Sequence, residues 1–244
     1  MDMKAMEPHG MALEAYFKGD TTAELIICRD DGLHAPLQAR HFFREPSEFT
    51  AIEKAVLDLC RGRILDVGAG TGLHSLVLQE KGLRVTAIDI IPQALKIMKQ
   101  RGVIDARCLD IFNLREKPFD TILVLGHGIG LVETISGLDR FLAHVASLLS
   151  ADGQILLDSL DVRITDDPAN LAYQEANRQA GRYPGEIRLQ FEFQGVRGPC
   201  CGWLHVDDET LRERANKRGL KGEIIRKEPW GEYLARLTRK APSD

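Results

Sequence analysis

The sequence has few of the features that mark disulfide-rich, metal-binding or membrane-spanning proteins. Only 5 of its 244 residues are cysteine, with no Cys-x-x-Cys pair and no Cys/His cluster at zinc-ligand spacing. No stretch reaches the roughly 18 to 20 apolar residues that span a bilayer, and the first residues lack the apolar run of a secretory signal. These absences predict a cytoplasmic protein with reduced thiols, no bound metal and no membrane partner.

The sequence also lacks a large excess of charge of one sign. The 32 basic and 36 acidic residues leave a formal net charge of −4, which gives no general attraction for nucleic acid. Basic residues gather between positions 212 and 227, but no stacking aromatics are interleaved with them, so a solvated helix face is the simpler interpretation. The sequence therefore argues against a nucleic-acid partner, and it does not indicate an oligomeric state.

Short apolar runs alternate with helix-period segments from about residue 63 onward. The first five runs occupy residues 63–67, 84–88, 106–109, 119–125 and 154–157. They are apolar throughout rather than alternating, as expected for a parallel sheet that helices cover on both faces. Two more runs, 222–226 and 233–238, are too close for a crossover connection and should be antiparallel. The pattern predicts an α/β fold with a doubly wound, mostly parallel seven-stranded sheet and an antiparallel last strand.

A glycine-rich loop joins the first run to the helix that follows it. Residues 66–72 read DVGAGTG. Glycines permit positive φ and let a ligand approach bare backbone, and the start of the next helix offers unpaired N–H groups to an anionic group. The loop predicts a site for a phosphate or a carboxylate. A tight turn without a ligand is the alternative.

Acidic residues follow the next two runs. Asp89 follows the second run, at a position where a carboxylate in such folds accepts hydrogen bonds from two ribose hydroxyls. Asp110 follows the third run and can accept a hydrogen bond from an adenine amine, with Ile90 and Ile111 placed to enclose the ring. The simpler alternative is that each carboxylate is only a turn or cap residue. Together they predict an adenosine-type ligand.

In this order, these features resemble the class I S-adenosylmethionine-dependent methyltransferases. The resemblance covers residues 63–158 and includes Phe119-Asp120 at the start of the fourth run and LLSADGQ at 148–154, which leads into the fifth. The closing strand pair is also similar to that family, whose reversed seventh strand lies between the fifth and the sixth. The resemblance implies methyltransferase activity with S-adenosyl-L-methionine as cofactor. A dinucleotide is a distant alternative, because the third glycine falls one position earlier than in its fingerprint.

The resemblance also implies which residues bind the cofactor. They are Asp66, Gly68, Ala69 and Gly70 for the loop and the methionine part, Asp89 for the ribose, Ile90, Asp110 and Ile111 for the adenine, and the backbone of Leu125 and Gly126 for the methionine amine. Arg40, Phe43 or Arg44 is expected to close the site from the amino-terminal side.

The alternation of apolar runs and helix-period segments stops after residue 160. Strict alternation over 187–193 predicts a half-exposed strand, which pairs with 203–206 in a hairpin. Such insertions commonly build substrate lids. We therefore expect one methyltransferase domain in four parts: an amino-terminal helical cap (1–60), a cofactor-binding core (61–160), a substrate lid (161–206), and a closing helix with the antiparallel strand pair (207–244).

Methyl transfer from a sulfonium is an in-line displacement that requires no catalytic dyad. A general base is needed only if the acceptor arrives protonated. His127 follows the fourth run, where the family often presents substrate-facing residues, and an imidazole titrates in the useful range. We predict a base or substrate-orienting role for His127. A histidine packed in a glycine-rich turn is the alternative.

The leading hypothesis is methyl transfer to a small-molecule acceptor, because the lid is a single compact insertion and no separate nucleic-acid-binding domain is evident. A catalytically silent protein that binds the cofactor in a regulatory or partner role is the alternative from another class. A nucleic-acid methyltransferase is a more distant one. The acceptor and the methylated atom do not follow from the sequence.

Overall fold

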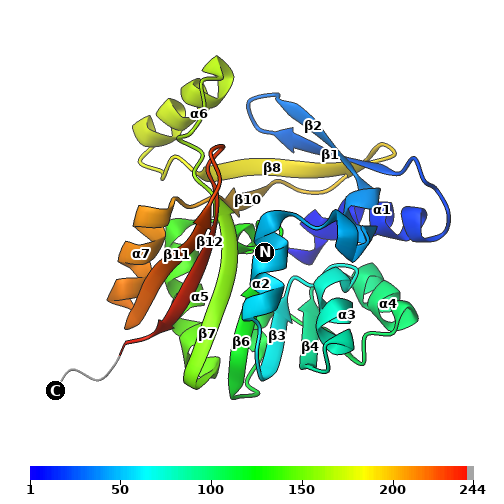
Figure 1. Ribbon diagram of the computed structural model, residues 1–244. Helices are drawn as coiled ribbons and strands as arrows, with labels where there is room; N and C mark the ends of the chain where they lie inside the picture. Colours follow the sequence, from blue (N-terminus) through cyan, green and yellow to red (C-terminus); the bar gives the residue numbers. More distant parts are fainter. Residues whose placement is uncertain (241–244) are drawn as a thin grey trace.

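The computed structural model describes residues 1–240 and has two sheets, of which the larger contains seven strands (Figure 1). Its order is β11-β12-β7-β6-β3-β4-β5. The strands are β3 (Arg63–Val67), β4 (Arg84–Asp89), β5 (Asp105–Cys108), β6 (Phe119–Val124), β7 (Leu149–Leu160), β11 (Leu220–Lys227) and β12 (Glu232–Arg239). Strands β3 to β7 are mutually parallel, whereas β12 runs antiparallel to both β7 and β11. The predicted α/β fold is confirmed, including the reversed last strand.

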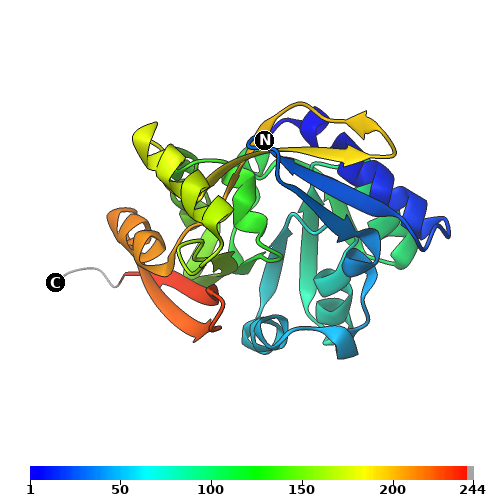
Figure 2. The same cartoon turned by 90° about the horizontal axis from the view of Figure 1, so that it is seen from above.

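Helices cover both faces of this sheet (Figures 1 and 2). They are α2 (Ala51–Leu59), α3 (Leu73–Glu80), α4 (Pro92–Arg101), α5 (Ile135–Leu148) and α7 (Asp208–Lys217). Helices α2 and α3 share a core with Ile64 and Leu123 on one face, and α5 and α7 share a core with Ile122 and Tyr233 on the other. Because neighbouring strand residues face opposite cores, the strands are apolar at successive positions.

The smaller sheet contains strands from two distant parts of the chain. They are β1 (Glu24–Arg29), β2 (His34–Gln38), β8 (Glu186–Phe193), β9 (Val196–Arg197) and β10 (Cys201–Leu204), all paired antiparallel. The predicted hairpin is present as the pairing of β8 with β10, although its second strand occupies residues 201–204 rather than 203–206. Figure 1 shows this sheet lying across the end of the larger one.

The first 60 residues differ from the helical cap that the sequence predicts, because they contribute β1 and β2 as well as helices. Strand β8 offers a second edge after pairing with β10, and β1 pairs with that edge over residues 189–192. Helix α1 (Glu7–Phe17) then buries Leu13 in a core shared with the small sheet and α4. Helix α6 (Pro168–Gln179) lies in the 161–206 insertion. Within residues 1–240, no helix is both long and apolar enough to cross a membrane.

Candidate functional site

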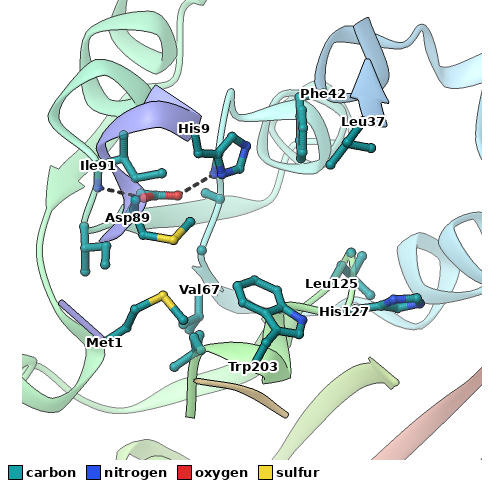
Figure 3. Close-up of a pocket in the computed structure, with 18 of the residues that line it drawn as sticks. Met1, His9, Leu37, Phe42, Val67, Asp89, Ile91, Leu125, His127 and Trp203 are labelled. Atoms are coloured by element: carbon teal, nitrogen blue, oxygen red, sulfur yellow. Dashed lines mark hydrogen bonds between the residues drawn. The ribbon is translucent and has the colours of Figure 1, made fainter. Parts of the chain in front are cut away.

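A cavity of about 660 Å³ lies between the two sheets. Its floor is the edge at which β3, β4 and β6 end, and its roof is the small sheet with α1. In Figure 3, Asp89 and His9 lie toward one side of the cavity, and His127 lies toward the other beside Leu125. Every residue predicted to bind the cofactor lines this cavity except Asp66.

The glycine loop adopts the backbone that its sequence requires. Gly68, Gly70 and Gly72 have φ of 69°, 56° and 80°, a backbone region that residues other than glycine rarely occupy. A Cβ atom at Gly68 or Gly70 would meet no atom within 4 Å, so bare backbone faces open space there. The N–H groups of Gly68 and Ala69 both donate to the carbonyl of Ile88, which ties the loop to β4.

Asp89 lies at the end of β4 and is 7% exposed. Its Oδ2 accepts a 2.8 Å hydrogen bond from the Gly70 N–H, and its Oδ1 accepts a 2.9 Å bond from the Ile91 N–H. Burial raises the pKa of the carboxyl despite these two bonds. A carboxylate has about four lone-pair directions, so it retains capacity for two more donors from a ligand.

Asp66 lies behind the glycine loop rather than in the cavity. It is 2% exposed, and its Oδ2 accepts a 2.6 Å hydrogen bond from Ser75 Oγ on α3. Burial raises its pKa. The bond links the end of β3 to the helix after the loop, the position from which a side chain can hold the loop in place.

The third predicted acidic residue has a local role. Asp110 accepts a 2.8 Å hydrogen bond from the Phe112 N–H and caps the short 3-10 helix Ile111–Asn113. Asp110, Ile90 and Ile111 all line the cavity near Asp89. The cap and a contact with adenine are compatible, because the carboxylate has further lone pairs.

Of the three residues predicted to close the site from the amino-terminal side, the structure brings one to the cavity. Arg44 lines the cavity, whereas Arg40 and Phe43 do not. The Arg44 guanidinium donates two hydrogen bonds, of 3.1 and 2.8 Å, to the buried Glu53 carboxylate, which also contacts His74 Nε2 at 2.9 Å. Arg44 therefore closes one wall as part of a paired cluster.

His127 has an unusual backbone that neighbouring groups support. Its φ is 56°, in the left-handed region that costs a residue other than glycine some free energy and is concentrated at functional sites. Asp158, at 3% exposure, accepts hydrogen bonds from the N–H groups of Gly126 (3.1 Å) and His127 (2.9 Å). These two bonds fix the turn after β6.

Three side chains surround the imidazole of His127. Its Nε2 lies 3.5 Å from Oε1 of Glu232, the first residue of β12. The Asp158 carboxylate lies on β7, and the ring of His205 meets the His127 ring edge-on at 5.4 Å. Asp158 and Glu232 are brought together because β12 runs beside β7 in reverse, with Leu234 opposite Asp158.

The charges of this group are coupled. Burial lowers the pKa of His127, but the contact with Glu232 and the charge of Asp158 outweigh it, so the pKa is raised overall. Burial raises the pKa of Asp158 to about 6 and lowers the pKa of His205 to about 3. His205 is therefore a neutral imidazole near pH 7, and its buried Nδ1 has no hydrogen-bond partner in the structure.

The same group also offers metal-ligand atoms. His127, Asp158 and Glu232 each present one such atom, and the three lie within 4.8 Å of one another. The sequence predicts no metal, and that stays a prediction. The site residues predicted from the sequence do not include Asp158 or Glu232. Asp158 lies in the fifth apolar strand and has the same signal as Asp89, an acidic side chain where apolar strand residues end, whereas nothing local distinguishes Glu232.

Strand order, the glycine loop and the acidic strand end together define a Rossmann-like fold of the class I methyltransferase type. A family model described as a methyltransferase domain matches residues 64–153. A crystal structure of an S-adenosylmethionine-dependent methyltransferase from Bacteroides fragilis, in complex with S-adenosyl-L-homocysteine, is 33% identical. The match covers 97% of this chain and 96% of that chain, with a TM-score of 0.84. The chain belongs to the S-adenosylmethionine-dependent methyltransferases.

Curated relatives match about half of this chain. A ubiquinone biosynthesis O-methyltransferase from Xanthomonas euvesicatoria is 32% identical over 139 residues, which are 54% of this chain and 54% of the relative. The match to the corresponding Xylella fastidiosa protein is 29% identical over 136 residues and covers 52% of this chain and 53% of that relative. The chain spans about half the length of the curated relatives it matches.

Proposed function

We propose that the protein transfers a methyl group from S-adenosyl-L-methionine to a small-molecule acceptor by in-line displacement inside the cavity between the two sheets. The observation that carries the proposal is the convergence of three features on one cavity: the bare glycine loop, the Asp89 carboxylate and the His127 group. In a closed site of this kind, alignment of donor and acceptor supplies much of the rate acceleration.

The residues present fit this cofactor. Gly68 and Gly70 leave open space where a Cβ would otherwise lie, which suits close approach of the methionine part. Asp89 retains lone pairs for the ribose hydroxyls, and Ile90, Asp110 and Ile111 line the wall assigned to the adenine. The backbone at Leu125 and Gly126 lines the cavity, and we assign it to the methionine amine. When bound, the cofactor supplies an electrophilic methyl group on a sulfonium.

His127 is proposed to act on the acceptor as a base or an orienting group. It lies at the end of the cavity away from Asp89 (Figure 3), and Asp158 and Glu232 hold its backbone and its ring. The raised pKa of His127 places its titration above the ordinary value of 6.5. An imidazole in this range accepts a proton efficiently near neutral pH.

The size of the site favours a small acceptor. The cavity has about 660 Å³ for donor and acceptor together, within the range of roughly 300 to 1,000 Å³ that small-molecule sites occupy. The small sheet covers it as a roof, and a polymer would have to enter past that roof.

Calorimetry with S-adenosylmethionine and S-adenosylhomocysteine tests the proposal first, followed by transfer of a labelled methyl group to an acceptor panel. We expect binding of both compounds and methylation of at least one class of small molecule. Folded protein that binds neither compound would exclude the proposal. Binding without transfer across the whole panel would instead favour the catalytically silent alternative.

A further inference from the structure

The acceptor end of the cavity contains more negative than positive charge. Asp158 and Glu232 contribute two carboxylates, and the imidazole of His127 lies beside both, with one ligand atom of each residue within 4.8 Å of the others. His205 faces the same group as a neutral ring, because burial lowers its pKa to about 3. These carboxylates are not fully neutralised by the protein.

No cation of the cavity wall compensates for this excess. Among the described residues that line the cavity, the arginines are Arg29 and Arg44, and there is no lysine. Met1 also lines the cavity, but its amino group pairs with Glu133 at 3.1 Å. Arg29 makes two 2.8 Å hydrogen bonds to Asp31, and Arg44 is paired with Glu53. An acceptor with a carboxylate or a phosphate would therefore find no free partner at this end.

The roof above the charged end is apolar and aromatic. Leu37, Leu189, Phe191 and Trp203 project from the small sheet into the cavity. Trp203 lies against the turn that carries His127, since a Cβ at Gly130 would be 2.1 Å from the Trp203 ring. An apolar body fits below this roof, and an aromatic ring also attracts an organic cation.

We propose that the acceptor is a small organic amine with an apolar body, which binds as an ammonium between Asp158 and Glu232 beneath Trp203. The proposal rests on the proposed function and names its substrate class. An ammonium fits better than a metal ion, because Nε2 of His127 already faces the Glu232 carboxylate and Oε2 of Glu232 accepts a 3.1 Å bond from Trp230. An organic cation can use the remaining oxygen lone pairs without displacing these contacts.

The chemistry balances without a further reactant. The ammonium gives one proton to the neutral imidazole of His127 and becomes a neutral amine with a free lone pair. That lone pair forms the new N–C bond while the C–S bond breaks, and the bonding electrons go to sulfur. The sulfonium becomes a neutral thioether, and the positive charge moves to the methylated nitrogen.

Three probes with one body and different head groups test the assignment: 2-phenylethylamine, 2-phenylethanol and phenylacetate. Binding of each to the protein saturated with S-adenosylhomocysteine is measured by calorimetry. We expect the amine to bind at least about tenfold more tightly than the alcohol, the value of one charge-assisted hydrogen bond, and phenylacetate to bind weakest. Glu232→Gln should remove most of the amine's advantage and leave binding of the alcohol unchanged.

A matched variant controls for charge alone. Glu223→Gln removes a carboxylate from the exposed neighbouring strand β11, where Glu223 pairs with Arg236 outside the cavity. We expect the amine to bind this variant as it binds the unchanged protein. Equal affinity for the amine and the alcohol, or no amine binding at its solubility limit, overturns the proposal.

Binding measurements distinguish the amine from two other cations, the cofactor sulfonium and a metal ion. If the carboxylates serve the cofactor sulfonium, Glu232→Gln weakens S-adenosylmethionine but not S-adenosylhomocysteine, and amine binding does not change. If they serve a metal, Mn²⁺, Mg²⁺ or Zn²⁺ binds the unchanged protein in calorimetry and Glu232→Gln abolishes that binding. Either result overturns the amine assignment. Failure to bind S-adenosylhomocysteine at all would instead refute the proposed function.

Discussion

The N–H of Gly70 donates a 2.8 Å hydrogen bond to Oδ2 of Asp89, so the glycine loop after β3 and the end of β4 are tied together. The second oxygen of Asp89 accepts from the Ile91 N–H at the start of the next helix. One buried carboxylate thus fixes both crossovers that form the floor of the cavity. The contact makes Asp89 a support of the loop as well as a candidate ribose ligand.

Asp89→Ala is expected to weaken S-adenosylhomocysteine binding by about 3 kcal/mol, the value of two lost hydrogen bonds to a charged acceptor. This corresponds to roughly a hundredfold in affinity. Calorimetry on the folded variant checks it. Asp89→Asn is the companion variant, because its amide oxygen can still accept one N–H bond from the loop. Unchanged affinity in both variants would contradict the ribose contact.

His127→Asn should reduce turnover while S-adenosylhomocysteine binding stays close to that of the unchanged protein. Asparagine tolerates the left-handed backbone at this position, so the turn should be preserved. Loss of a general base typically costs about 10²- to 10⁴-fold in rate. His34→Ala, at an exposed position of β2, is the control and should keep full activity.

The pH profile gives a second test of His127. A base must be neutral to accept a proton, so the rate should rise with pH through a midpoint above 6.5, since the pKa of His127 is raised. Glu232→Gln removes the strongest of the groups that raise it, and the midpoint should move to lower pH. A profile that is flat from pH 6 to 9 would reject the base role.

Gly130→Ala should disturb the roof and spare the cofactor site. The added Cβ would lie 2.1 Å from the Trp203 ring, which must move. Overpacking of this kind typically costs about 1 to 3 kcal/mol of stability. We expect weaker acceptor binding, altered tryptophan fluorescence and nearly unchanged affinity for S-adenosylhomocysteine.

A double-mutant cycle separates this clash from a general loss of stability. Trp203→Leu creates space beside position 130, so the stability loss of Gly130→Ala should be smaller in the Trp203→Leu background. Additive effects on the free energy of unfolding would show that residues 130 and 203 do not interact.

The Glu53 cluster should make the protein sensitive to acid. Burial by itself raises the pKa of Glu53, but hydrogen bonds from His74, the Thr50 N–H and Arg44 outweigh it and lower the pKa from 4.5 to about 2. A carboxyl whose pKa is lower in the folded state stabilises the fold above its unfolded pKa. This contribution, on the order of 2 to 3 kcal/mol, should disappear as the pH falls from about 4.5 to about 2.

Urea unfolding of the unchanged protein and of Glu53→Gln across this pH range measures the effect. The difference in unfolding free energy should be constant near neutral pH and shrink below about 4.5. Glu80→Gln is a matched control, because Glu80 is an exposed glutamate at the end of α3. A difference that does not change with pH would show that the Glu53 contacts are not the source.

The sequence by itself determined the larger sheet and the side of the cavity formed by the glycine loop and Asp89. Strand, glycine loop and helix follow one another within residues 63–80, and apolar periodicity is a local property. Because parallel strands end at one edge of a sheet, the loop after β3 and Asp89 at the end of β4 meet without further information.

Only the tertiary structure decided the roof and the acceptor end. Strand β1 pairs with β8, which lies more than 150 residues later in the sequence. The segment predicted as a helical cap therefore contributes strands to the small sheet that covers the cavity. Glu232 reaches His127 because β12 is inserted in reverse beside β7, which places its first residue at the edge where the parallel strands end. Contacts between distant segments depend on strand order and on the packing of two sheets, and no local pattern encodes either.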